Sequence, residues 1–186
     1  IDETGKITGL TEEGKLATEI IIPEEINGTT ISGIGNDVFK DNTNLTEVVI
    51  PDSVNTIGNG AFSGCSNLKE IQIPNSVEKI DSYAFSDCES LQHIEIPSGI
   101  KEIPYGVCNN CENLESIILP KSIEVLSEWS VGCHKLENLY YKGTMEDWLN
   151  IKIKSVYSNA MIYASNFYML DGHNQWYEVT SIEIPD

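Results

Sequence analysis

Apolar positions recur along the chain with a period of 23 residues, marked by prolines that follow Ile or Leu. Within each unit, apolar residues lie three and six positions after the proline, and an Ala–Phe pair or its counterpart lies at ten and eleven. A Leu-x-x-Ile-x-Ile run then leads to the next proline. Self-similarity of this length indicates a stack of equivalent structural units. The prolines are Pro51, Pro74, Pro97 and Pro120, and the paired positions are Ala61–Phe62, Ala84–Phe85, Val107–Cys108 and Ser130–Val131.

Each unit is expected to contain a short strand, a return segment and a turn. Ile71 and Ile73 alternate with polar residues, which predicts a strand with both side chains directed inward. Pro74 cannot donate a ladder hydrogen bond, so it ends the strand. The segment Ser-Tyr-Ala-Phe-Ser-Asp-Cys, residues 82–88, is expected to form a helical turn. One unit cannot bury its apolar edge alone, and stacking of units buries a continuous core.

The first residues depart from the repeat and are expected to cap it. Residues 1–28 form this predicted cap, with two strands, at 6–10 and 17–23, on either side of a hairpin-like turn at 11–15. Asn27–Gly28 lies in an insertion of five residues and predicts a tight turn. An open end of a repeat stack would expose its core, which is why a cap is needed there.

About five repeats are assigned to residues 29–142, and the last is one residue short just before Cys133. Residues 143–180 are expected to form a second cap that contains one short helix. Thr144 is its predicted N-cap, and the acidic residues that follow suit the positive end of a helix. Residues 181–186 contain another Ile-x-Ile-Pro run and are interpreted as the truncated start of a further repeat block, or as an ordinary edge strand.

The pattern I-P-x-S-V-x-x-I-x-x-x-A-F-x-x-C-x-x-L-x-x-I resembles the BspA-type leucine-rich repeats of bacterial surface proteins. The resemblance covers roughly residues 31–141, and residues 140–151 are similar to the segment that commonly ends such arrays. It implies a leucine-rich repeat solenoid: a β-rich right-handed superhelix with short parallel strands and short helical turns, capped at both ends. It also implies an extracellular or cell-surface binding protein, often discussed as an adhesin, and does not imply an enzyme or a particular ligand.

Charge narrows the range of partners. The chain has 11 Lys and Arg against 29 Asp and Glu, a net charge of −18. This charge repels the phosphates of nucleic acids and disfavours anionic membrane surfaces. No apolar run is long enough to span a bilayer, so direct insertion into a membrane is not expected. We expect a monomer without a cofactor.

Five cysteines are the most conspicuous candidates for chemistry. Cys65, Cys88 and Cys111, with Cys133, occupy one column between an inward Phe position and an inward Leu, where a thiol acts as a small apolar side chain. Asn42 holds that column in the first repeat and would need hydrogen-bond partners from loop carbonyls and amides.

The alternative is a redox or zinc site built on the Cys-x-x-Cys pair Cys108 and Cys111, with Cys133 and His134 completing a zinc set. The repeat columns already account for both cysteines of the pair, so we favour a structural role and expect no metal. No histidine column accompanies the cysteines, so no Cys–His catalytic pair is expected either.

The outward positions of the strands are the predicted binding site. They flank the inward residue of each strand and should form two columns on the concave surface, acidic at the amino-terminal end and apolar at the other. The expected function is noncovalent binding of a protein or glycan there, and the alternative is a structural spacer that presents another domain and has no ligand. The pairs are Glu47/Val49, Glu70/Gln72, His93/Glu95, Ser116/Ile118 and Asn138/Tyr140.

Overall fold

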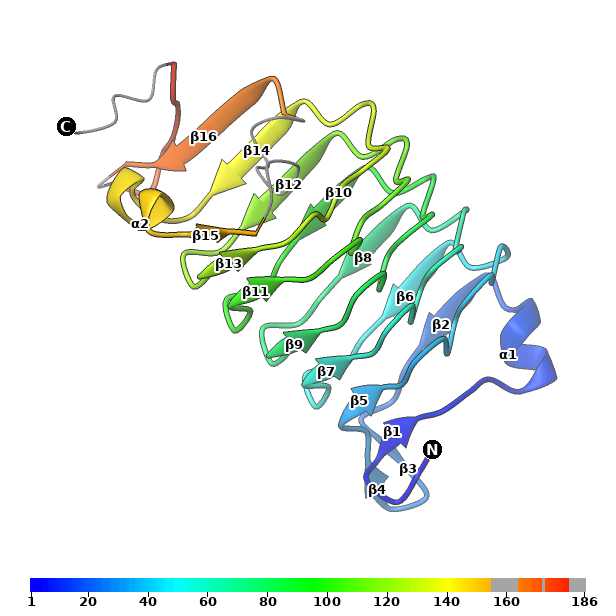
Figure 1. Cartoon of the computed structure of the whole chain (residues 1–186). Coiled ribbons are helices and arrows are strands. Elements are labelled where there is room, and N and C mark those ends of the chain that lie inside the picture. The colour runs from blue at the N-terminus through cyan, green and yellow to red at the C-terminus, as the bar shows by residue number, and fades with distance from the viewer. Residues whose placement is uncertain (155–163, 172, 181–186) are drawn as a thin grey trace.

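The computed structural model describes residues 1–154, 164–171 and 173–180, which form a solenoid of stacked coils. Each coil contributes a strand to two rows that run along the molecule on opposite sides of the core (Figure 1). The predicted solenoid fold is confirmed. The segment 181–186, interpreted from sequence as a further repeat block, lies outside the described residues.

The row of longer strands, here called the long face, contains seven parallel strands and a final antiparallel one. Its ladder is interrupted only between β8 and β10, which lie side by side (Figure 1). Alternate side chains point into the core, as predicted. The strands are β2 (Glu19–Ile21), β6 (Glu47–Val49), β8 (Glu70–Gln72), β10 (His93–Glu95), β12 (Ser116–Leu119), β14 (Asn138–Tyr141), β16 (Asn166–Leu170) and β17 (Trp176–Glu178).

The second row, the short face, consists of parallel strands of two residues each, built from the return segment after each proline. The apolar residue that ends most of them is buried, for example Ile57 and Ile103. The strands are β1 (Lys6–Ile7), β5 (Gly33–Ile34), β7 (Thr56–Ile57), β9 (Lys79–Ile80), β11 (Glu102–Ile103), β13 (Val125–Leu126) and β15 (Lys152–Ile153).

The third side of each coil is made of tight turns, and none of the described turns extends into a helix. The N–H of Ser63 donates to the carbonyl of Gly60 at 2.9 Å, a local bond of helical-turn type. Alternate N–H groups instead reach the next coil: Phe62 donates to Ala84 and Phe85 to Val107, at 2.8 and 2.9 Å. These bonds form a third backbone ladder between the turns of successive coils, and the N–H groups used in it are not available for a helix. The residue before each position of the cysteine column has a positive φ and is a residue that tolerates it: Asp41, Gly64, Asp87, Asn110 and Gly132.

The core is a set of side-chain columns along the solenoid axis. Phe39, Phe62 and Phe85 stack with ring centroids 4.8 and 5.6 Å apart. At about 25 cal/mol per Å² of apolar surface removed from water, fully burying one such side chain contributes roughly 1.5–3 kcal/mol. Because each coil contacts mainly its neighbours, the core is built up one step at a time along the solenoid.

The alignment of the last repeat inferred from sequence was wrong by one residue. Cys108 donates its N–H to Trp129 and Asn110 donates to Val131, one residue earlier than in the other coils. The missing residue therefore falls before Trp129. Trp129 and Ser130 take the inward positions, with no exposed surface, and Val131 is 37% exposed. Trp129 therefore occupies the column of Ala61, Ala84 and Val107, and Ser130 occupies the column of Phe62, Phe85 and Cys108.

The amino-terminal cap differs from the hairpin expected at residues 11–15. Those residues lie around helix α1 (Glu12–Leu16), which begins at the N-cap Thr11. The strands on either side belong to different faces, since β1 pairs with β5 and β2 with β6. The cap's hairpin is instead formed by β3 (Glu25–Ile26) and β4 (Thr29–Thr30), joined at Asn27–Gly28 as predicted. Both turn residues have a positive φ, 51° and 81°, as a type I′ turn requires.

The carboxy-terminal cap contains the predicted helix, α2 (Met145–Leu149), with Thr144 as its N-cap. Thr144 and Asp147 form a reciprocal capping box. Buried Trp148 packs against Tyr141 and Phe167, with ring centroids 5.1 and 4.6 Å away. Helix α2 thus covers the core where the last coil ends, close to the β14 and β16 end of the long face (Figure 1).

Candidate interaction surface

The structure places all ten predicted binding residues on the outer side of the long face, in two rows along the solenoid. The first row consists of the first residue of each strand, and the second row consists of the residue two positions further along the same strand. In-register pairing aligns Glu47 with Glu70 and Val49 with Gln72. It also aligns His93 with Ser116 and Asn138, and Glu95 with Ile118 and Tyr140.

Strand pairing extends both rows at their two ends, which sequence reasoning missed. Glu19 and Ile21 of β2 pair with Glu47 and Val49. Asn166 and Tyr168 of β16 pair with Asn138 and Tyr140. The Ile-x-Ile-Pro run at residues 20–23 was a usable signal for the first pair, but the irregular spacing after residue 142 gave none for the second.

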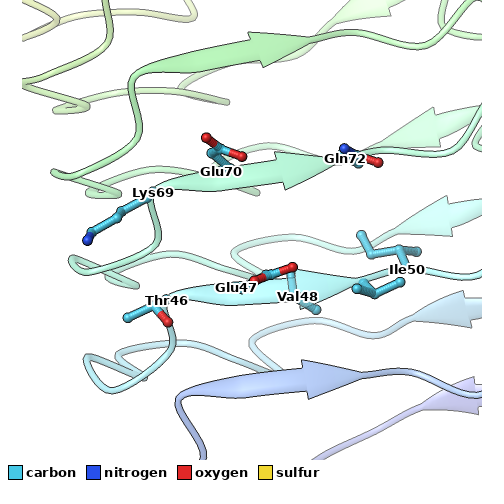
Figure 2. A pocket seen from close by; sticks show the side chains of 8 residues that line it. Thr46, Glu47, Val48, Ile50, Lys69, Glu70 and Gln72 are labelled. Atoms are coloured by element: carbon cyan, nitrogen blue, oxygen red, sulfur yellow. The ribbon is translucent and has the colours of Figure 1, made fainter.

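The amino-terminal half of the long face is acidic and partly apolar. Glu19, Glu47 and Glu70 lie on neighbouring strands, and none takes part in an ion pair with a described residue. In Figure 2, Glu47 and Glu70 lie one above the other, and the side chain of Lys69 leads away from them. Glu47, Glu70 and Lys69, with Thr46, Val49 and Gln72, line an open hollow of about 400 Å³.

The carboxy-terminal half is largely engaged with itself. His93 Nδ1 and Ser116 Oγ are 2.8 Å apart, and Asn166 Nδ2 donates to Asn138 Oδ1 at 3.0 Å. Lys142 Nζ lies 2.5 Å from Glu95 Oε1, so this carboxylate is already paired. The polar positions of this half therefore offer fewer free groups to a partner than Glu47 and Glu70 do.

Tyr140 is covered more than its outward position suggested. Its ring stacks on Tyr168 with centroids 4.8 Å apart and meets the edge of Trp176 at 5.0 Å. Each tyrosine ring therefore covers one face of the other. Tyr140 therefore helps to attach the carboxy-terminal cap as well as lying on the outer side.

The cysteines are all free and buried, in agreement with the structural role predicted for them. Each thiol of the column donates to a backbone carbonyl of the preceding coil: Cys65 to Phe39, Cys88 to Phe62, Cys111 to Phe85 and Cys133 to Cys108, at 2.9–3.2 Å. Burial raises the pKa of the Cys65 thiol to about 12 and raises that of Cys88 well above its usual range. Thiols with such raised pKa values are poor nucleophiles.

Asn42 makes fewer hydrogen bonds than its position in this column led us to expect. Its Oδ1 accepts the N–H of Asn44 at 3.3 Å, but its Nδ2 has no partner among the described residues. Within that same part of the chain, no group of three His, Cys, Asp or Glu side chains is placed to hold a metal ion.

Several bacterial proteins of known structure are similar to this chain. The model of the BspA type leucine rich repeat region matches residues 32–164 in six copies. A leucine rich cell surface protein of Faecalibacterium prausnitzii is similar in structure, with a TM-score of 0.65, 32% identity and coverage of 75% of this chain and 36% of that one. A T. pallidum leucine rich repeat protein has a TM-score of 0.61 and 26% identity, and the match covers 71% of this chain and 66% of that one.

The pneumococcal vaccine antigen PcpA shares the fold, with a TM-score of 0.68, 21% identity and coverage of 92% of this chain and 40% of that one. The chain thus spans between about a third and two thirds of the length of these solved chains.

No curated protein matched the sequence. No helix among residues 1–154, 164–171 and 173–180 is long and apolar enough to cross a membrane. The repeat columns, the stacked coils and the matched family model agree: the chain belongs to the BspA-type leucine-rich repeat family.

Proposed function

We propose that this chain is an interaction module of a bacterial cell-surface or secreted protein and binds another protein noncovalently through the long face. The observation that carries the proposal is the amino-terminal half of that face, where Glu47 and Glu70 have no ionic partner among the described residues and lie beside exposed Val49. Repeat proteins use extended surfaces of this kind for binding. Unpaired charges next to apolar side chains suit a partner with basic residues and apolar contacts.

A protein partner fits the long face better than a glycan does. Glycan recognition would draw on flat aromatic surface, and the outward positions of the amino-terminal half (Glu19, Ile21, Glu47, Val49, Glu70 and Gln72) include no aromatic side chain. The free groups are carboxylates and aliphatic side chains, which suit a basic polypeptide. The similarity to a cell surface protein of Faecalibacterium prausnitzii supports the location at the cell surface.

The test starts from arrays of purified extracellular proteins and glycans, followed by surface plasmon resonance titrations of each binder. We expect a protein binder whose affinity falls about tenfold or more for Glu47→Lys or Glu70→Lys, largely through slower association. Glu78→Lys is the matched control, because Glu78 is an exposed acid that leads into the short face. Equal affinity for all variants would contradict the proposal, and the absence of any binder would favour a spacer.

Substitutions at two other predicted binding residues are poorer tests. Glu95→Lys would break the ion pair with Lys142. Tyr140→Ala would remove contacts to Tyr168 and Trp176 and so disturb the cap. Reduced binding by either variant could follow from a local change in structure, whereas Glu47 and Glu70 are free of such contacts.

A further inference from the structure

Strand β2 is the outermost strand of the long face at its amino-terminal end (Figure 1). Within the described residues it pairs only with β6, in parallel, with Glu19 opposite Glu47 and Ile21 opposite Val49. The far side of β2 is therefore a sheet edge. Such edges are templates on which another strand can pair.

The backbone groups on that edge are free. The carbonyl of Thr18 accepts N–H groups from Thr46 and Glu47 at 2.7 and 3.3 Å, and the N–H of Ile22 donates to Val49 at 3.0 Å. Backbone groups alternate in direction along a strand, so the N–H and C=O of Glu19 and Ile21 point away from β6. No backbone hydrogen bond from another described residue reaches these four groups.

The side chains of β2 give the edge little protection. Natural edge strands are often guarded by proline, by charged side chains, by a bulge or by being very short. Strand β2 has three residues with one charged side chain, Glu19, and Pro23 follows its end after one intervening residue. The sequence here is Glu-Ile-Ile-Ile, residues 19–22, and Ile21 is 76% exposed. Ile20 points inward but is only partly buried, whereas Val48 beside it is buried. An added strand would complete the burial of Ile20.

Charge identifies the kind of strand that fits. Residues 1–30 contain seven acidic residues and two lysines, one of which, Lys15, is already paired with Glu12. Glu19 begins the row continued by Glu47 and Glu70. A second copy of this chain would bring the same acidic edge and a net charge of −18, so self-association is electrostatically opposed. A cationic strand is attracted instead.

We propose that β2 accepts an extended, cationic segment of a partner protein as an added strand. A Lys or Arg of the segment lies opposite Glu19, where opposite charges on neighbouring strands attract. The residue between is apolar and points inward beside Ile20, and a second Lys or Arg lies opposite Ile21, where its aliphatic stem packs on the exposed side chain. Main-chain hydrogen bonds to Glu19 and Ile21 supply the affinity, and the alternating side chains supply the selectivity.

The probe is a capped, dye-labelled peptide of sequence Lys-Val-Lys-Val-Lys-Val-Lys, titrated with the whole chain by fluorescence anisotropy at low salt. Two control peptides separate strand addition from charge attraction. One replaces every Lys by Glu, and the other replaces every Val by Pro and keeps the charge but cannot form a ladder. We expect both controls to bind at least about tenfold more weakly. Equal binding of the Pro peptide would overturn the proposal.

Ile21→Pro is the decisive variant, because it removes an N–H that points to the open edge and none that bonds to β6. Proline is tolerated on edge strands in that orientation. We expect affinity for the Lys–Val peptide to fall about tenfold or more, with Ile21→Val as the matched control at wild-type affinity. Far-ultraviolet circular dichroism and a thermal melt establish that Ile21→Pro is folded. Unchanged affinity in folded Ile21→Pro would overturn the proposal.

Amide hydrogen exchange provides a second readout that does not depend on a variant. Addition of the peptide should slow exchange at Glu19 and Ile21 and leave Glu70 and Gln72 unchanged. Protection at Glu70 alone would place the peptide on the face instead and would contradict edge pairing. A dimer in sedimentation equilibrium that dissociates in Ile21→Pro would show that a second copy occupies the edge. The face variants of the proposed function leave β2 unchanged, so the two proposals can fail separately.

Discussion

The cysteine column shows how one kind of side chain can satisfy several structural needs at once. Each thiol fills a small buried space and donates to a carbonyl of the preceding coil, as Cys88 does to Phe62 at 3.2 Å. The same carbonyl oxygen of Phe62 also accepts the N–H of Cys65 at 3.1 Å, so the thiol of Cys88 bonds to the second lone pair of that oxygen. Asn42 lies in the first coil, and its Nδ2 finds no equivalent partner among the described residues. The thiol is therefore suited to repeats in which the preceding coil offers an equivalent turn carbonyl.

Cys88→Ala should lower the free energy of unfolding by about 1–2 kcal/mol, because it removes a buried atom and one hydrogen bond while the carbonyl keeps its other donor. Urea unfolding measures the change. Ser90→Ala, two residues away and partly exposed, is the control and should stay within about 0.5 kcal/mol of the wild type. In the same samples, Ellman's reagent should label the thiols only as the protein unfolds; rapid labelling of the folded protein would contradict a buried, inert column.

At the scale of single elements, helix α2 depends on its capping box because it has only five residues. Asp147 accepts the N–H and the hydroxyl of Thr144, both at 2.8 Å, and lies 3.1 Å from Lys121 Nζ. These hydrogen bonds, and then Lys121, lower the pKa of Asp147 to about 2. The short helix is thereby fixed where Trp148 must enter the core.

Asp147→Asn should therefore destabilise the protein at neutral pH and lose this effect in acid. A carboxylate whose pKa is lower in the folded state than in the unfolded state stabilises the fold, and this contribution is complete at pH values above the unfolded pKa of about 3.9. The stabilisation is lost as the pH falls from about 4 to about 2. Urea unfolding of both proteins across this range should show the difference closing. Glu146→Gln is the control, since the Glu146 side chain bonds to no described residue; a constant difference for Asp147→Asn would refute the proposed role.

At the scale of the whole molecule, each coil of the solenoid contacts mainly the coils on either side of it, and helix α2 covers the core at the carboxy-terminal end. The stacked coils depend on one another in order, and Trp148 covers the last of them between Tyr141 and Phe167. In such one-dimensional folds, stability is approximately a sum of unit and interface contributions. Damage to one end should therefore stay largely local.

Trp148→Ala should lower the stability of the carboxy-terminal coils by about 3–5 kcal/mol, the usual range for a buried Trp truncated to Ala. Hydrogen exchange should become faster in β14 and β16 and change little in β6 and β8. Leu149→Ala is the matched control, because Leu149 follows in the same helix and is 44% exposed. Uniformly faster exchange along the whole chain would mean that the solenoid unfolds as a single unit.

The predicted elements show where local pattern was sufficient. The Asn27–Gly28 turn and the Thr144 cap were identified from sequence because their chemistry is contained in a few adjacent residues. A helical turn was expected at residues 82–88, yet the N–H groups of Tyr83, Phe85 and Asp87 bond to the next coil. Likewise α1 replaced an expected hairpin, because the strands on either side of it pair with partners on different faces. Such choices depend on neighbours that a local window does not contain.

The sequence by itself determined the period, the inward columns and the outward positions of the long face. The reason is geometric: strand side chains alternate, and a constant repeat length brings equivalent residues into register. Only the tertiary structure decided which outward residues are free. Lys142 pairs with Glu95 from 47 positions away, and Trp176 reaches Tyr140 from a later strand, whereas Glu47, Glu70 and the edge of β2 stay open. Long-range contacts of this kind follow from the path of the chain, which the repeat pattern does not encode.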